Sequence, residues 1–188
     1  MRVYSDVKAA PNKEREIIPA GGYVAKVKAA MVEDTKHGDR LIIYFEVADG
    51  DYRGFFQRDY DAQPQEDKKW RGVYRTYLPK EDGSEKDGWS KTTLSGIIWA
   101  FEESNPGFHW DWDEAKLKDK TVGVLFRNKE WEMNGNTGWT TQCCKLTDAD
   151  SIRQGKFKTP KDKPLANQAF SAPGGFSELP NDDDLPWK

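Results

Sequence analysis

The sequence contains little cysteine and little histidine. Cys143 and Cys144 are its only cysteines, and two histidines stand among its 188 residues. Adjacent strand residues point to opposite faces, so these thiols are poorly placed to share a metal ion or form a structural disulfide. Two histidines leave few groups that titrate near neutral pH for acid–base catalysis. We therefore predict ordinary strand cysteines, no redox centre and no enzymatic activity.

Long apolar runs are also absent. No stretch of the sequence approaches the about 20 apolar residues that a transmembrane helix needs. The first residues are largely polar and lack the apolar segment of a signal peptide. Glycine-rich phosphate loops, nucleophile elbows and the chain order of a Ser-His-Asp triad are missing as well. We expect a cytoplasmic protein with no membrane partner, no metal and no cofactor.

Aromatic residues, by contrast, are plentiful. The chain has eight Trp, seven Tyr and nine Phe residues. A core of this size does not need so many, so we expect some rings on the surface. The 29 basic and 32 acidic side chains give a net charge of −3. This balance argues against purely electrostatic binding of nucleic acid, although the local electrostatic field along a groove matters more than the net charge of the chain.

Alternation of apolar and polar residues predicts five strands, which lie at residues 23–32, 40–48, 52–60, 121–132 and 137–146. The second has the clearest pattern, with one apolar face formed by Leu41, Ile43, Phe45 and Val47. The turn signals His37-Gly38-Asp39 and Asp49-Gly50-Asp51 join the first three strands into a meander. Asn134-Gly135 is a hairpin signal between the last two.

A single helix is predicted between the third and fourth strands, after an insertion at residues 61–88. Ser90 would cap this helix, Asn105-Pro106-Gly107 would end it, and its apolar stripe is Leu94, Ile97, Ile98 and Phe101. Three strands, a helix and two strands is the element order of the OB fold. We therefore predict a mainly β protein with an OB-fold-like five-stranded antiparallel barrel, one helix between strands three and four, and a disordered C-terminal tail.

The segment Lys68–Lys80 combines cations with aromatic rings. It holds five basic groups and three rings in 13 residues, and no acid. Unpaired nucleotides need this combination, because cations neutralise phosphates and flat rings stack on bases. As a strand, the segment would place Trp70 and Tyr74 on one face and Arg71, Arg75 and Tyr77 on the other. As a helix, it would align Trp70, Tyr74 and Tyr77, and the pattern leaves both arrangements open.

The meander adds further candidates, because an OB barrel binds its ligand across strands two and three. Tyr44 lies on the polar face of the second strand, and Phe56, Arg58 and Tyr60 share a face of the predicted third strand. Two lysines oppose the apolar face of the first strand. The full set of predicted nucleic-acid-binding residues is Lys26, Lys28, Tyr44, Phe56, Arg58, Tyr60, Lys68, Lys69, Trp70, Arg71, Tyr74, Arg75 and Tyr77.

The stretch His109–Glu114 is the best candidate for an enzyme site. It places one histidine and three carboxylates within six residues, alternating with two Trp residues. Such groups can ligate a divalent metal in a nuclease. Only this one stretch supplies ligands, however, and His37 lies in a predicted turn. We expect the Trp residues to anchor the loop and the acids to remain solvated.

The chain ends in Asp182, Asp183 and Asp184, followed by Leu185, Pro186, Trp187 and Lys188, behind a stretch rich in Pro, Gly, Ser and Asn. Contiguous like charges repel and solvate, whereas an acidic run beside one aromatic residue is typical of a docking peptide. This tip resembles the acidic C-terminal tip of bacterial and phage single-stranded-DNA-binding proteins. It has Trp187 where those tips have Phe, and Lys188 follows the aromatic.

The body of the chain, from Gly21 to Leu165, is similar to small phage-encoded replication and recombination proteins. The similarity runs through Lys69–Arg75 and Asn105–Asp113. The resemblance implies a phage-type single-stranded-DNA-binding protein, with an OB-fold-like DNA-binding domain at 1–150 and a flexible linker with an acidic docking tip at 151–188. It also implies that residues 182–187 recruit replication or recombination proteins in the cytoplasm of a bacterial host.

Two other functions remain open from the sequence. One is an adaptor or inhibitor that grips a host protein through its aromatic surface and does not bind DNA. The other is a metal-dependent nuclease centred on His109. The sequence does not decide between monomer and homo-oligomer, or between DNA and RNA.

Overall fold

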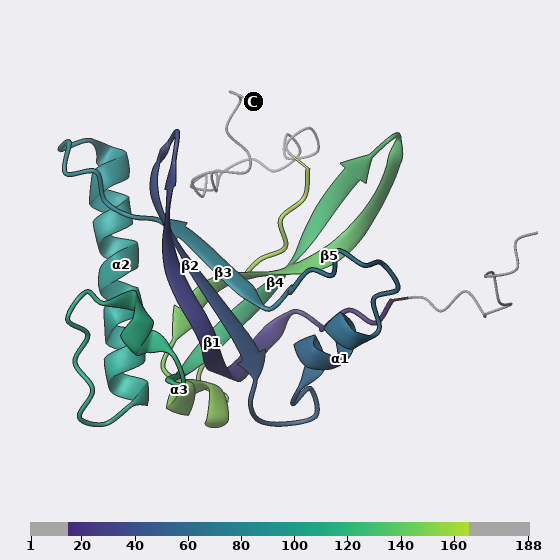
Figure 1. Ribbon diagram of the computed structural model, residues 1–188, viewed down its shortest axis with the longest axis horizontal. Helices are drawn as coiled ribbons and strands as arrows, with labels where there is room; N and C mark the ends of the chain where they lie inside the picture. Colours follow the sequence, from purple (N-terminus) through teal and green to yellow (C-terminus); the bar gives the residue numbers. More distant parts are fainter. Residues whose placement is uncertain (1–14, 166–188) are drawn as a thin grey trace, which may run out of the picture.

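The longest strand lies at the centre of a five-stranded antiparallel sheet with the order β3-β2-β1-β4-β5 (Figure 1). The computed structural model describes residues 15–165. In chain order the elements are β1 (Gly21–Thr35), β2 (Gly38–Val47), α1 (Phe55–Asp61), β3 (Val73–Tyr77), α2 (Glu85–Ser104), the 3-10 helix η1 (Glu114–Leu117), β4 (Thr121–Met133), β5 (Asn136–Thr147) and α3 (Ala149–Arg153). The mainly β class and the helix between strands three and four are confirmed.

The edges of the sheet are β3 and β5. These two strands approach each other, but no ladder of hydrogen bonds joins them among residues 15–165. The structure therefore shows the sheet of the predicted OB-fold-like topology, with β1 paired to both β2 and β4. None of the helices in this part of the chain is both long and apolar enough to cross a membrane.

The core lies on one face of the sheet and follows the predicted alternation of β2. Leu41, Ile43, Phe45 and Val47 are all buried, as expected. Phe45 packs edge-on against Phe56 and Phe126, with ring centres 5.7 and 6.1 Å apart. From α2, Ile97 and Phe101 complete this core. The two free cysteines lie on β5, and burial raises the pKa of the Cys143 thiol.

The prediction of a strand at 52–60 is wrong, because this segment turns and forms α1. Both Phe55 and Phe56 are buried, and adjacent residues of a strand cannot face the same core. Glu46 of β2 stabilises the helix start, since its carboxylate accepts the backbone N–H groups of Phe56 at 3.0 Å and Gln57 at 2.7 Å. Such a carboxylate accepts N–H groups that have no partner within the helix, and its negative charge interacts favourably with the positive end of the helix dipole.

The third strand instead lies inside the predicted insertion. Residues 73–77 pair with β2, so the strand arrangement of the basic-aromatic segment is confirmed over these residues. Helix α2 also begins earlier than predicted. Its cap is Ser84, not Ser90, and the Ser84 hydroxyl accepts the backbone N–H of Asp87 at 3.2 Å. The predicted end at Asn105 is confirmed.

Helix α3 covers the opposite face of β1 and β4. It follows β5 directly, and Asp148 caps it by accepting the backbone N–H of Ser151 at 2.6 Å. Burial opposes ionisation of Asp148, but hydrogen bonds from Ser151 outweigh it and lower the pKa of the carboxyl. The helix lies so close to the sheet that a Cβ at Gly22 or Gly123 would fall within 3 Å of the Ile152 side chain.

Candidate nucleic-acid interface

The predicted interface residues of the sheet gather on the face of β1, β2 and β3 opposite the core, here called the outer face. Directly paired residues share a face, and the pairs Tyr44–Val73, Ile42–Arg75 and Arg40–Tyr77 alternate with the buried pair Ile43–Tyr74. The outer face therefore carries Lys26, Arg40, Tyr44, Arg75 and Tyr77. This is the surface across strands two and three that OB folds use for oligonucleotides.

A β-bulge in β1 directs Lys28 across this face. The register with β2 shifts between Val27 and Ala29, so Lys28 and Ala29 are both exposed although they are neighbours. Bulges commonly re-aim a side chain in this way. The Lys28 ammonium lies 4.0 Å from the centre of the Trp70 ring and donates to Gln57 Oε1 at 3.1 Å. Lys28 thus bridges β1 to the end of the face near α1.

Four side chains form a compact group at that end, here called the α1 cluster: Lys28, Tyr60, Lys68 and Trp70. The Tyr60 and Trp70 ring centres are 5.9 Å apart and their planes are tilted by 44°. Lys68 Nζ lies 5.6 Å from the Tyr60 ring centre. The indole N–H of Trp70 donates to the carbonyls of Phe45 and Gly72, which fixes the ring while leaving it partly exposed. Cations and rings alternate here as stacking sites require.

Several predicted cations are neutralised by carboxylates. Both oxygens of Asp59 accept Arg71 Nη1, at 2.9 and 3.0 Å, and Arg15 donates to the same carboxylate at 3.1 Å. Lys26 and Lys69 form looser ion pairs, at 3.5 Å with Asp119 and at 3.9 Å with Asp67. These exposed pairs are worth little and are readily exchanged for another anion. Arg71 is the most firmly held of the three.

Other predicted cations bond only to neutral oxygens among the described residues. Arg58 donates to the carbonyl of Arg53 at 2.6 Å, and Lys68 donates to the carbonyl of Asp61 at 3.0 Å. Lys28 bonds to an amide oxygen, as described above, and Arg75 is exposed on the outer face. The positive charge of these four side chains is therefore not offset by an ion pair within residues 15–165.

Two predicted stacking rings belong to the core. Phe56 is 3% exposed and Tyr74 is 5% exposed, so neither presents a ring face to solvent, and their placement on an accessible surface was wrong. Tyr74 points inward because it pairs with the core residue Ile43, and burial raises the pKa of its phenol. Tyr44, Tyr60, Trp70 and Tyr77 are partly exposed.

Sequence reasoning missed the rings of the β4–β5 hairpin. Trp131 is 37% exposed and Trp139 is 48% exposed. Trp131 packs over Gly138, its partner in the ladder, where a Cβ would lie 2.7 Å from the indole. This hairpin and the β1–β2 hairpin project from the same end of the sheet (Figure 1). Loops at these two positions border the ligand face of OB folds, and the Asn-Gly turn was the signal that pointed to the hairpin.

The segment that precedes the acidic tip is attached to β4. The backbone N–H of Lys163 donates to the carbonyl of Asn128 at 2.8 Å, and the N–H of Glu130 donates to the carbonyl of Lys163 at 2.9 Å. The N–H of Leu165 donates to the Glu130 carboxylate at 3.0 Å. The tip itself, Asp182, Asp183, Asp184, Leu185, Pro186 and Trp187, lies outside the described residues.

The stretch His109–Glu114 does not assemble metal ligands. Within residues 15–165, no group of three His, Cys, Asp or Glu side chains could hold a metal ion. The His109 side chain is 88% exposed. Asp111 instead pairs with Lys116, and this hydrogen bond lowers the pKa of the Asp111 carboxyl. Trp110 is partly buried against the core, as expected of an anchor, whereas Trp112 is 68% exposed.

A scan against models of protein families finds no match, and a search among curated proteins finds none either.

Proposed function

We propose that this protein is a phage-type single-stranded-DNA-binding protein that coats unpaired DNA with little sequence preference and catalyses no reaction. The α1 cluster supports the proposal most directly, since it interleaves Lys28 and Lys68 with the rings of Tyr60 and Trp70. The outer face continues the surface through Tyr44 and Arg75. Phosphates would contact the cations, and bases would stack on the rings with roughly 1–3 kcal/mol each.

The acidic tip would recruit proteins of phage DNA replication or recombination in the bacterial cytoplasm. Residues 182–187 combine three carboxylates with Leu185, Pro186 and Trp187. Charge of this kind speeds and orients encounter, while Trp is among the residue types that contribute most contact energy when they fill a partner's pocket. Because residues 163–165 are hydrogen-bonded to β4, the tail would start beside the β4–β5 hairpin.

A titration of intrinsic Trp fluorescence with single-stranded and double-stranded oligonucleotides tests DNA binding. We expect strong preference for the single strand and quenching of the stacked rings. Four phosphate contacts, from Lys28, Arg58, Lys68 and Arg75, predict a slope of about −3 for log affinity against log salt. The absence of binding even at low salt would overturn the proposal and favour the adaptor function, and cleavage with Mg²⁺ or Mn²⁺ would favour a nuclease.

Removing residues 171–188 tests the tail. We expect a several-fold higher affinity for single-stranded DNA at low salt, because three Asp side chains can occupy phosphate positions on the empty surface. Partner binding is lost in the same variant. The full-length variant carrying Asp182→Asn, Asp183→Asn and Asp184→Asn is the matched control and reproduces the gain if charge is the cause. Unchanged affinity in both proteins rules out masking by the tail.

A further inference from the structure

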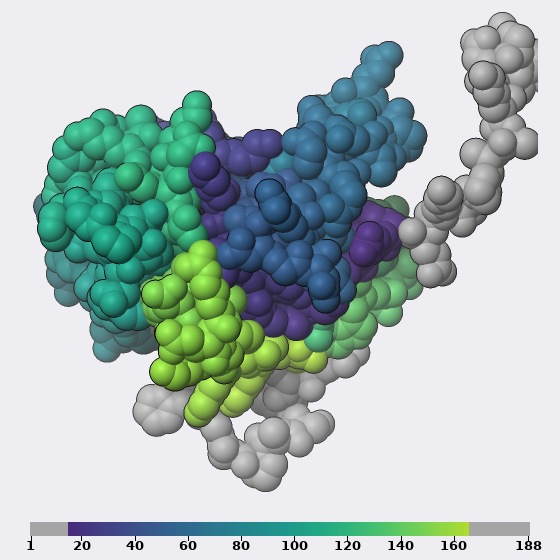
Figure 2. All heavy atoms as spheres, turned by 90° about the horizontal axis from the view of Figure 1, so that it is seen from below, coloured from purple at the N-terminus to yellow at the C-terminus, as the bar shows by residue number. Residues whose placement is uncertain are grey.

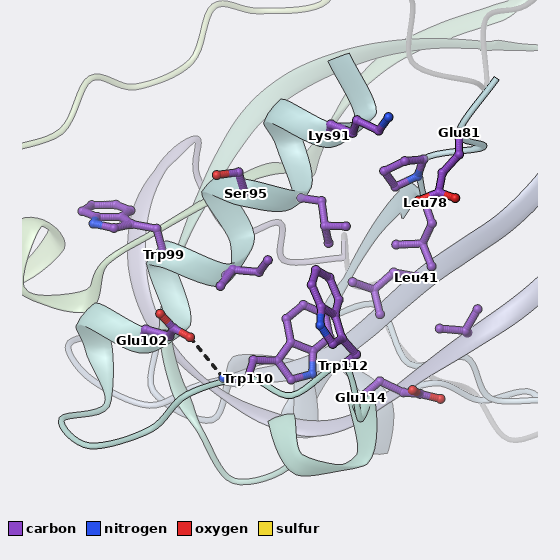
Figure 3. A pocket seen from close by; sticks show the side chains of 14 residues that line it. Leu41, Leu78, Glu81, Lys91, Ser95, Trp99, Glu102, Trp110, Trp112 and Glu114 are labelled. Atoms are coloured by element: carbon purple, nitrogen blue, oxygen red, sulfur yellow. Dashed lines mark hydrogen bonds between the residues drawn. The ribbon is translucent and has the colours of Figure 1, made fainter. Parts of the chain in front are cut away.

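An apolar groove of about 680 Å³ lies between α2, the β1–β2 hairpin and the loop 108–114 (Figure 3). Its walls include Leu94, Ile98 and Trp99 of α2, Val32 of β1, and Trp110 and Trp112 of the loop. The groove lies on the inner side of the β1–β2 hairpin, away from the outer face. In the space-filling view, α2 and the loop (teal to green) form a lobe on one side, with the blue segment that contains α1 on the other (Figure 2).

Helix α2 has more apolar surface than the core uses. Ile97, Ala100 and Phe101 are buried and account for the contact with the sheet. Leu94 and Ile98 line the groove and are only partly buried, and Trp99 is 52% exposed. An apolar patch that folding leaves open on a soluble protein marks a contact site for another molecule.

The loop holds Trp112 at the mouth of the groove in a strained conformation. Its φ is +71°, a left-handed backbone that bulky side chains rarely adopt. The neighbouring Trp110 is fixed, because its backbone N–H donates to the Glu102 carboxylate at 3.1 Å and its indole donates to the carbonyl of Asp113 at 3.0 Å. The two ring centres are 6.0 Å apart. Strain that keeps an exposed ring in place is typical of binding sites.

The charge around the groove is negative. Glu81, Glu102 and Glu114 line it, and the one lining cation among the described residues, Lys91, is paired with Asp87 at 2.8 Å. The sign is therefore opposite to that of the α1 cluster, so a nucleic acid does not suit this site. The acidic tip of the chain is excluded by the same repulsion. Complementary ligands combine apolar side chains with cations.

We propose that the groove binds a cationic amphipathic helix of a partner protein. The apolar side chains of such a helix, spaced i, i+3/i+4 and i+7, would insert between Leu94 and Ile98 of α2 and Trp112 of the loop. Its Lys and Arg residues would meet Glu81 and Glu114. The rings that border the groove project into solvent, which suits a large partner surface better than an enclosed small molecule. This docking site does not include the residues proposed to contact DNA or those of the acidic tip.

The test uses the full-length protein and a fluorescein-labelled, amidated peptide of Leu and Lys in amphipathic helical order, measured by anisotropy. We expect saturable binding that Trp99→Ala and Trp112→Gly each weaken roughly tenfold or more. Trp112→Gly removes the ring and suits the positive φ, so it keeps the fold intact. Trp89→Ala is the matched control, because Trp89 is an α2 residue with 43% exposure that does not line the groove. This variant binds like the unmodified protein.

A second peptide tests whether binding to the groove depends on the charge of the ligand. A peptide with Glu in place of Lys binds at least tenfold more weakly, and Glu81→Gln with Glu114→Gln removes most of that difference. Equal affinity of both peptides, or unchanged binding in Trp99→Ala and Trp112→Gly, overturns the proposal. Loss of binding when Asp182, Asp183 and Asp184 are changed to Asn also overturns it, since the peptide then binds the tip. Self-association through the groove, seen as a concentration-dependent dimer that Trp112→Gly dissociates, overturns it in favour of a second copy.

Discussion

Reversing the charge of Lys28, Lys68 and Arg75 together, as Lys28→Glu, Lys68→Glu and Arg75→Glu, is expected to weaken single-stranded-DNA binding roughly 100-fold or more at low salt. These side chains have no carboxylate partner within residues 15–165, so each is available to a phosphate. Reversal removes that contact and adds a repulsion. The salt slope should fall to about −1, since one of the four proposed phosphate contacts, Arg58, remains.

The control for this experiment is a second triple variant with the same net charge. Lys86 and Lys91 of α2 and Lys116 of η1 are exposed and belong to elements that pack on the core side of the sheet. Lys86→Glu, Lys91→Glu and Lys116→Glu together should therefore change affinity less than about threefold. Fluorescence titrations of both variants at several salt concentrations separate a local site from a general charge effect. Equal losses in the two proteins contradict a site on the outer face.

Substituting Gly72 by Ala is expected to destabilise the protein by about 3 kcal/mol, because there is no room for a side chain. A Cβ there would lie 2.3 Å from the carbonyl oxygen of Phe45 and 2.6 Å from the Phe56 ring. Gly72 also accepts the Phe45 backbone N–H at 2.8 Å, so relief of the clash separates the chain from β2. Thermal unfolding should shift downward by roughly 6–12 °C.

Gly96→Ala is the matched control in the same protein. Gly96 lies inside α2, and a Cβ there meets nothing within 4 Å. Replacing a glycine inside a helix with alanine reduces the conformational entropy of the unfolded chain, so we expect a gain of about 0.5–1 kcal/mol. An unchanged melting temperature for Gly72→Ala would contradict the close packing of residues 70–72 on β2.

Four of the five strands follow from their local patterns. Alternation along β2 identified its buried face, and the Asn-Gly turn identified the β4–β5 hairpin. The third strand could not be located from its local pattern. The alternation of Phe56, Arg58 and Tyr60 fits a strand, but the neighbouring Phe55 is equally buried, and only the three-dimensional core shows that both rings face one side. The Ser84–Asp87 pair was a readable sign of the true start of α2.

The candidate site was predictable in composition but not in orientation. The pattern of cations and rings singled out Lys28, Tyr60, Lys68 and Trp70, which the structure brings together. It could not tell which rings turn inward, because the pairing of Tyr74 with Ile43 decides that. The position of Lys28 depends on a bulge, which has no signal in the sequence. Likewise, the apolar groove is formed when the β1–β2 hairpin comes to lie beside α2 and the loop 108–114, which follow much further along the chain.

Neighbouring residues of β2 face two different surfaces. Leu41 lines the α2 groove, while Arg40 lies on the outer face beside Tyr77, 5.9 Å from that ring. The β1–β2 hairpin therefore carries both surfaces, with the groove on its inner side and the outer face on the other. Molecules bound at the two surfaces would contact the same hairpin. Two binding equilibria that share an element in this way are linked. Any factor by which the groove ligand changes the affinity for DNA is also the factor by which DNA changes the affinity for the groove ligand.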